Sequence, residues 1–235
     1  YRLIALNGMD DMHATHISAR VPGSEHHFLI NPYGLLFSQV TASNLVKIDI
    51  NGNIVEDTPY SINPAGFVIH SAVHAAREDA ICVIHTHTVA GIAVACLEEG
   101  LLPLSQKSMR FYKRIAYHDY EGKADDLDER SRLVRDLGPH NAMILRNHGL
   151  LACGRSVSRA YKTIYNLERA ARSSWLLCRA VARPSRFQKK KWNTQPSNST
   201  EMMCLVAQGQ TVGRLCSCIW TKWIRDTGTN CAAAD

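Results

Sequence analysis

The chain contains 235 residues, of which 46% are hydrophobic and 20% are charged, and its formal net charge is +6. This composition is typical of a globular protein and excludes a disordered chain, and no apolar run is long enough to span a bilayer. Because the positive residues are dispersed apart from a short run at residues 189–191, the charge does not favour nucleic-acid binding, and without a signal peptide we expect a cytoplasmic protein.

Short strands and helices alternate along most of the chain. In chain order, we expect a strand at 28–30, a strand at 45–50, a helix at 67–77, a strand at 80–85, a helix at 88–98, helical residues at 105–111, a strand at 115–117, a helix at 127–137, a strand at 143–145 and a long helix at 157–181. The Asn51-Gly52 pair predicts a hairpin turn after the second strand. This alternation predicts an α/β architecture built in layers.

The character of the sequence changes near residue 183. All eleven histidines precede residue 149, whereas three of the four tryptophans and four of the eight cysteines follow residue 183. We therefore predict one domain over residues 1–183 and an atypical tail over residues 184–235, which is a linker or disordered and could arise from a shifted reading frame or a mispredicted exon boundary. Cys216 and Cys218 have no nearby histidine or second cysteine pair that would predict a metal site, and no disulfides are expected.

The most informative motif is the pair His85-x-His87 at the end of a predicted apolar strand. In a strand, residues i and i+2 project from the same face, so these two imidazoles would lie side by side. A third histidine, His148 in an Asn-His-Gly sequence, follows another predicted strand. Three such imidazoles could form a catalytic zinc site with an open fourth position. The spacing alone leaves open whether a metal binds.

Several longer segments carry a resemblance to a known family. INPAGFVIHSAVHAAREDAICVIHTHTVAGIAV, LSQKSMRFYKRIAYHDYEG and ILRNHGLLACG together resemble the class II aldolase and adducin head-domain family, over roughly residues 5–182. The resemblance implies a three-layer α/β/α sandwich around a mostly antiparallel sheet, a small-molecule substrate and a homotetramer. It also implies a divalent metal, usually zinc, held by His85, His87 and His148.

The resemblance does not extend to the glutamate that serves as acid and base in this family's aldolases and epimerases. Sugar-phosphate aldolases and epimerases of this family carry a Ser-Ser-Glu segment, whose glutamate lies four residues before a helix histidine and serves as acid and base. Counting back from His70 places Gly66 at that position, and Thr15-His16 stands where the family has a Gly-Asn pair. A positioned base typically contributes about 10²–10⁴-fold to the rate. The catalytic residue is therefore left unknown by the sequence.

Other residues could supply part of the missing chemistry. His70 could act as a base, although it shares a helix face with His74 and both could serve packing. Asp119 or Glu121 could orient a metal-binding imidazole or could cap a turn. Three basic residues could bind an anion or could simply be solvated: Arg20, Lys107 and Arg110.

Two functions from different classes follow. The first is a metal-dependent, lyase-like enzyme acting on a small hydroxy-carbonyl or hydroxy-acid substrate. The second is a non-enzymatic, adducin-like module for assembly or association with the actin cytoskeleton. The three histidines favour the first function, because a purely structural domain does not need three converging imidazoles. The missing glutamate favours the second function, or an enzyme with different chemistry.

Overall fold

The computed structural model describes residues 1–23, 26–122 and 129–180. The chain divides into a compact unit, Tyr1–Arg172, and a second unit that starts at Ser173, of which only the end of one helix is described. The tail predicted from residue 184, including Cys216 and Cys218, lies outside the described residues. None of the described helices is both long and apolar enough to cross a membrane.

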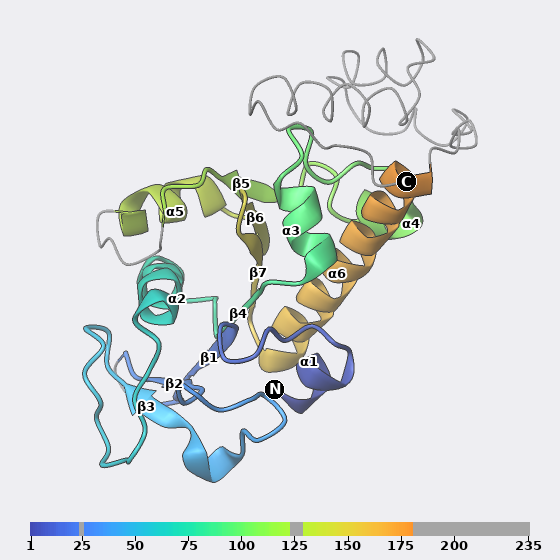
Figure 1. Cartoon of the computed structure of the whole chain (residues 1–235). Helices are drawn as coiled ribbons and strands as arrows, with labels where there is room; N and C mark the ends of the chain where they lie inside the picture. The colour runs from blue at the N-terminus through green and yellow to red at the C-terminus, as the bar shows by residue number, and fades with distance from the viewer. Residues whose placement is uncertain (24–25, 123–128, 181–235) are drawn as a thin grey trace. The chain divides into compact units, whose positions relative to one another are not determined.

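A seven-stranded sheet forms the centre of the compact unit, with the strand order β3-β2-β1-β4-β7-β6-β5 (Figure 1). The strands are β1 (His16–Arg20), β2 (Phe28–Ile30), β3 (Val46–Ile48), β4 (Cys82–Thr86), β5 (Ala116–His118), β6 (Ala142–Leu145) and β7 (Gly149–Gly154). All neighbouring strands are antiparallel except β5 and β6, which are parallel. The prediction of a mostly antiparallel sheet is confirmed.

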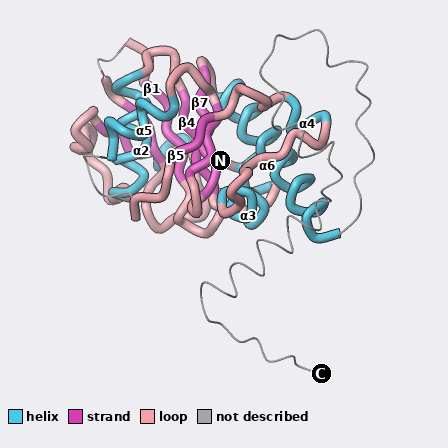
Figure 2. Tube along the Cα trace, turned by 90° about the horizontal axis from the view of Figure 1, so that it is seen from above, coloured by secondary structure: helices cyan, strands magenta, loops and turns pink. Residues whose placement is uncertain are grey.

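Helices cover both faces of this sheet. They are α1 (Arg2–Leu6), α2 (Pro64–Ala76), α3 (Val89–Ala95), α4 (Gln106–Met109), α5 (Glu129–Leu137) and α6 (Val157–Ala180), with a 3-10 turn at Ala42–Asn44. Figures 1 and 2 show α2 and α5 on one side of the strands, and α3 with α6 on the other. The predicted three-layer α/β/α sandwich is therefore confirmed.

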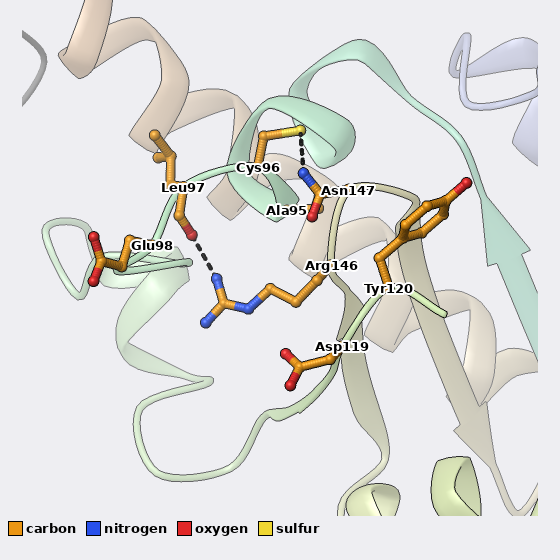
Figure 3. Close-up of a pocket in the computed structure, with 8 residues that line it drawn as sticks. All are labelled: Ala95, Cys96, Leu97, Glu98, Asp119, Tyr120, Arg146 and Asn147. Carbon is orange, nitrogen blue, oxygen red and sulfur yellow. Dashed lines mark hydrogen bonds between the residues drawn. The ribbon is translucent and has the colours of Figure 1, made fainter. Parts of the chain in front are cut away.

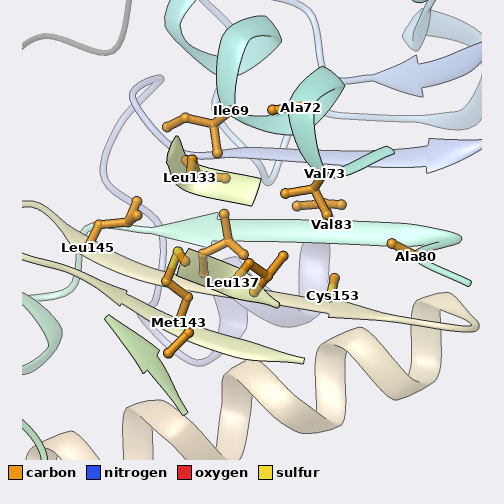
Figure 4. Close-up of a cluster of buried hydrophobic side chains, with 12 residues drawn as sticks. Ile69, Ala72, Val73, Ala80, Val83, Leu133, Leu137, Met143, Leu145 and Cys153 are labelled. Atoms are coloured by element: carbon orange, nitrogen blue, oxygen red, sulfur yellow. The ribbon is translucent and has the colours of Figure 1, made fainter. Parts of the chain in front are cut away.

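A large apolar cluster lies between the sheet and the layer formed by α2 and α5 (Figure 4). Ile69 and Val73 of α2 and Leu133 of α5 point into it and are at most 1% exposed. Each fully buried side chain of this size stabilises the fold by about 1.5–3 kcal/mol. Every residue of β4 and of β7 is buried, because these strands are covered on both faces. The cluster thus fixes the two strands that carry the histidine motifs.

The predicted elements are present with adjusted bounds. Helix α2 begins at Pro64 instead of residue 67, because proline suits the first turn of a helix, where its missing N–H is not needed. The strand predicted at 45–50 is shortened to β3, and the chain then turns where the amide of Gly52 donates to the carbonyl of Asp49 at 3.2 Å. The helix predicted at 105–111 is a single turn, α4.

Four elements were not predicted from the sequence: α1, β1, β7 and the 3-10 turn at Ala42–Asn44. Helix α1 has only five residues, too few for a helical period to be visible. Strands β1 and β7 are central, and each lies beside β4 in the sheet. These two strands align other residues with His85 of β4.

Candidate metal centre

Strand pairing brings the three histidines together. His85 lies within β4, and His87 follows just after the strand ends. His148 lies in the tight turn between β6 and β7. Because β7 runs antiparallel to β4, with Leu151 opposite His85, the turn that precedes β7 lies beside the end of β4. The sheet therefore brings two motifs, which are about sixty residues apart in the sequence, together at one end of the central strands.

The Asn-His-Gly sequence satisfies two constraints of this turn. Asn147 has a φ of 56°, in the left-handed region that asparagine tolerates better than most residues. A Cβ atom at Gly149 would lie 2.4 Å from the main-chain oxygen of Thr86, so only glycine allows the turn to approach β4 this closely. The residues on either side of His148 thus fix the position of its imidazole.

The three imidazoles converge on one point through their Nε2 atoms. His85 and His87 are 2.7 Å apart at Nε2, His87 and His148 are 3.0 Å apart, and His85 and His148 are 3.2 Å apart. Tetrahedral zinc binds imidazole nitrogens at about 2.0–2.1 Å, which places its ligand atoms about 3.3 Å from one another. The observed triangle is slightly smaller, and its size suits one shared ion.

Partners at the opposite ring nitrogens favour a proton-free Nε2 atom in His85 and in His87. Nδ1 of His85 lies 2.9 Å from the carbonyl oxygen of Leu150. A carbonyl only accepts, so Nδ1 carries the proton and the Nε2 lone pair faces the other two rings. Nδ1 of His87 lies 3.5 Å from a carboxylate oxygen of Asp11, which favours the same tautomer. Partners of this kind commonly orient metal-binding histidines.

The surroundings also keep the three imidazoles neutral. Burial lowers the pKa of His85 well below its usual value, and the neighbouring His148 and His87 lower it further. Burial, followed by the charge of His87, lowers the pKa of His148 to about 4. Burial lowers the pKa of His87 as well, against the opposing effect of Asp11. Neutral imidazoles bind metals, and three converging lone pairs repel one another unless a cation lies among them. The donor set therefore fits a divalent ion.

A second group of buried histidines lies beside this cluster and forms a hydrogen-bonded chain. Nδ1 of His74 donates to the carbonyl of Ala80 at 2.8 Å, so its Nε2 accepts the hydroxyl proton of Ser18 at 2.7 Å. The Ser18 hydroxyl in turn accepts from Nδ1 of His70 at 2.6 Å. Nε2 of His70 then accepts from Nδ1 of His16 at 2.9 Å. One carbonyl thus sets the direction of every bond, and Nε2 of His16 is left without a proton.

This series of hydrogen bonds requires neutral imidazoles, and burial keeps them neutral by lowering their pKa values. Burial is the main cause that lowers the pKa of His16 to about 3 and that of His74 to about 3. It also lowers the pKa of His70 well below its usual value. His70, which the sequence offered as a candidate base, is therefore a member of this series of hydrogen-bonded side chains. It is not one of the three converging histidines.

His16 places this series of hydrogen-bonded side chains next to the candidate metal centre. It lies opposite His85 in the pairing of β1 with β4, and the two ring centroids are 5.0 Å apart. A Cβ atom at Gly66 would lie 2.9 Å from the His16 ring. The imidazole of His16 therefore occupies space that any side chain at position 66, including a glutamate, would need.

The two acidic candidates lie elsewhere. Asp119 is exposed and lines a cavity of about 440 Å³ next to Arg146 and Tyr120 (Figure 3). Glu121 forms an ion pair with Arg132. Among the described residues, the group of side chains placed to share a metal consists of the three histidines alone.

None of the three basic candidates is part of the group of converging histidines. The Arg20 guanidinium donates to the carbonyl oxygens of His74 and Arg77 at the end of α2. Nζ of Lys107 donates to Oδ1 of Asn166 at 3.0 Å. Arg110 is exposed and lines a second cavity, whose lining includes residues of α6.

Sequence reasoning missed the contributions of Asp11 and His16 to the site. The segment from His16 to Arg20 alternates polar and apolar residues, which is the pattern of a half-buried strand and could have revealed β1. With that strand assigned, His16 and Ser18 would have been placed on one face. Asp11 carries no comparable signal, because it lies in a loop whose path depends on the folded sheet.

Comparisons with known proteins find similar sequences. A family model described as the class II aldolase and adducin N-terminal domain matches residues 1–175. A Caulobacter vibrioides protein, provisionally named as an aldolase class 2 protein, is 58% identical over 170 residues, covering 72% of this chain and 66% of that protein. Alpha-adducin of Rattus norvegicus is 46% identical over 170 residues, covering 71% of this chain but 23% of the adducin. The chain thus spans slightly less than two-thirds of the bacterial relative and under a quarter of the adducin.

Solved structures show the same fold. An aldolase II superfamily protein from Pseudomonas syringae superposes with a TM-score of 0.75 at 48% identity, covering 96% of this chain and 88% of that one. L-fuculose 1-phosphate aldolase from Glaciozyma antarctica PI12 superposes with a TM-score of 0.69 at 27% identity, covering 97% of this chain and 86% of that one.

Proposed function

Because the chain belongs to the class II aldolase and adducin family, we propose that it is a divalent-metal-dependent enzyme with lyase-like action on a small hydroxy-carbonyl or hydroxy-acid substrate. One observation carries the proposal. Three buried or half-buried imidazoles direct their Nε2 atoms at one point, within 3.2 Å of one another. A domain used only for assembly has no need of this arrangement, which desolvates three titratable groups.

His85, His87 and His148 would hold the ion, and zinc is the first candidate because it suits three imidazole ligands. Such an ion supplies Lewis-acid polarisation of a substrate oxygen. The Leu150 carbonyl and the Asp11 carboxylate keep two of the rings in the binding tautomer.

The proposed enzyme works without a carboxylate at position 66. Gly66 offers no group that could move a proton, and the His16 ring fills the adjacent space. The glutamate base of the sugar-phosphate aldolases is therefore absent from position 66. This absence separates the chain from those aldolases, whose motifs it otherwise resembles. The substrate is accordingly proposed only as a chemical class.

Metal analysis tests the first step. We expect purified protein, or apoprotein reloaded with zinc, to retain about one divalent ion per chain after desalting, as measured by inductively coupled plasma mass spectrometry. His87→Ala should lose the ion. His26→Asn is a matched control, because His26 is exposed and its φ of 57° suits asparagine. Equal metal content in both variants would contradict the proposal.

Activity is tested separately on protein of known metal content. The loaded protein should cleave a carbon–carbon bond in at least one member of a panel of small hydroxy-carbonyl and hydroxy-acid compounds, detected as aldehyde or ketone release. His87→Ala should show no release above background. A loaded protein that cleaves no member of the panel would count against lyase action while leaving the metal centre intact.

A second candidate is a non-enzymatic, adducin-like module for assembly or association with the actin cytoskeleton. It is favoured by the 46% identity to alpha-adducin and by the absence of a carboxylate at position 66. Co-sedimentation with filamentous actin distinguishes it from the enzyme. This candidate predicts binding to filaments that is unchanged in His87→Ala, whereas the enzyme predicts no binding.

The proposal includes a homotetramer in the cytoplasm, as the family resemblance implies. Size-exclusion chromatography with light scattering measures the mass of the assembly directly. A monomer at micromolar concentration would contradict the tetramer without affecting the metal centre.

A further inference from the structure

A basic cleft lies at the end of β6 that is remote from His148. It has a volume of about 370 Å³, within the range of small-molecule sites. Its walls come from the segment after α4, the turn before β6 and one face of α6. Because His148 follows the other end of β6, the cleft and the candidate metal centre lie at opposite ends of this strand.

Four cationic side chains line the cleft: Arg110, Arg114, Arg159 and Lys162. All four are exposed, and none forms an ion pair with a residue that the structure describes. No carboxylate is among the lining residues. Like charges gathered in this way repel one another, so the cleft is favourable for a multiply charged anion.

Neutral groups in the same cleft add directional contacts. Arg159, Lys162 and Asn166 are spaced along one face of α6. The side chain of Asn166 is held in place, because it donates to the carbonyl of Lys162 at 2.7 Å and accepts from Lys107 at 3.0 Å. Lys107 thereby brings a fifth cation to the edge of the cleft. A fixed amide and mobile cations together suit a phosphate-bearing ligand.

We propose that this basic cleft binds a small polyphosphorylated molecule at a site distinct from the metal centre. Two phosphate groups would match the number of cations, because each group could contact cations from both α6 and the segment after α4. Lys107 and Arg110, which the sequence marked as candidates for anion binding, belong to this cleft and not to the metal pocket.

Isothermal titration calorimetry with inorganic pyrophosphate tests the proposal. We expect saturable binding of one pyrophosphate per chain, tighter than the binding of inorganic phosphate and weakened by added salt. Arg159→Ala and Lys162→Ala should each weaken binding about tenfold or more, the usual loss for a hydrogen bond to a charged group. Arg135→Ala is the matched control, because this exposed arginine lies on α5, on the opposite side of the sheet.

A variant of the metal pocket separates the two sites. His87→Ala should bind pyrophosphate as the unaltered protein does, with folding checked by circular dichroism. Loss of binding in His87→Ala, with no effect of the two α6 variants, would assign the anion to the metal pocket and overturn the proposal. Non-saturable binding, or equal weakening by Arg135→Ala, would overturn it as well. Each of these outcomes is independent of whether the protein cleaves a substrate.

Discussion

Gly66 and His16 are coupled, although fifty positions separate them in the chain. Gly66 lies in the first turns of α2, and a Cβ atom there would lie 2.9 Å from two carbon atoms of the His16 ring. That ring cannot move aside freely, because Nδ1 donates to His70 at 2.9 Å and the residue is 3% exposed. The small residue at 66 and the large ring at 16 therefore depend on each other.

Substitution at position 66 tests this coupling. Gly66→Ala should lower the free energy of unfolding by about 1–3 kcal/mol, the usual cost of overpacking, although alanine in a helix is normally about 0.5–1 kcal/mol more favourable than glycine. In a His16→Asn background the same change should cost less or should stabilise. Urea unfolding of the two single variants and the double variant gives the coupling directly. Additive effects would show that the two residues do not interact.

The three candidate metal ligands differ in how far the sequence alone could predict them. His85 and His87 followed from the two-residue period of a strand. His148 could be named from its position after another predicted strand, but its distance from the other two histidines depends on the antiparallel pairing of β7 with β4. The role of His16 was not predicted, since it arises from the pairing of β1 with β4 and from the absence of a side chain at Gly66.

At the scale of elements, one buried histidine ties α5 to β5. His118 is 3% exposed, its Nδ1 lies 2.8 Å from a carboxylate oxygen of Asp136, and its Nε2 lies 3.3 Å from one of Glu129. Both acids lie on α5, whereas His118 ends β5. The tie holds α5 against an edge strand that would otherwise have only β6 as a neighbour in the sheet.

Removing this histidine should be costly. His118→Ala leaves Glu129, which is 7% exposed, without its hydrogen-bond partner, and an unsatisfied buried polar group typically costs about 1–3 kcal/mol. Urea unfolding measures the change. Glu121→Gln serves as the control, because Glu121 pairs with Arg132 at the surface, where such pairs contribute little. An equal effect of both substitutions would argue against the buried tie.

Most elements could be predicted from the sequence, and the exceptions have physical reasons. The helices α2 and α6 and the strand β4 have long apolar patterns. Strand β7 is buried on both faces, so its residues do not alternate, and its start merges with the Asn-His-Gly turn. The polar and apolar alternation of strand β1 extends over only five residues. The order of the strands could not be derived from local pattern, because it depends on pairings between distant segments.

At the scale of the whole molecule, the buried histidines make the stability sensitive to acid. The pKa values of His16, His74 and His148 are lowered to about 3, 3 and 4, chiefly by burial, whereas unfolding returns them to about 6.5. Below that value the unfolded chain binds protons that the folded chain does not. The stability that neutral histidines provide is therefore present above about pH 6.5 and is lost as the pH falls towards 4.

Urea unfolding of metal-free protein should show this loss. We expect the free energy of unfolding to fall between pH 7 and pH 4.5, with each of the three histidines contributing up to about 1.4 kcal/mol per pH unit below the unfolded pKa. A free energy of unfolding that is constant over this range would contradict the burial of neutral histidines.

Metal binding should raise the thermal stability, because an ion held by the three candidate histidines would join β4 to the turn between β6 and β7. An ion that binds only the folded state stabilises it by about 2.7 kcal/mol at a free concentration of 100 times Kd. For a chain of this size, that corresponds to a rise in Tm of about 5–10 °C. Differential scanning calorimetry of apoprotein with and without zinc measures the rise, which a chelator should reverse. His87→Ala should unfold at the same temperature with and without zinc, and a rise in this variant equal to that of the unaltered protein would place the stabilising ion outside the histidine triangle.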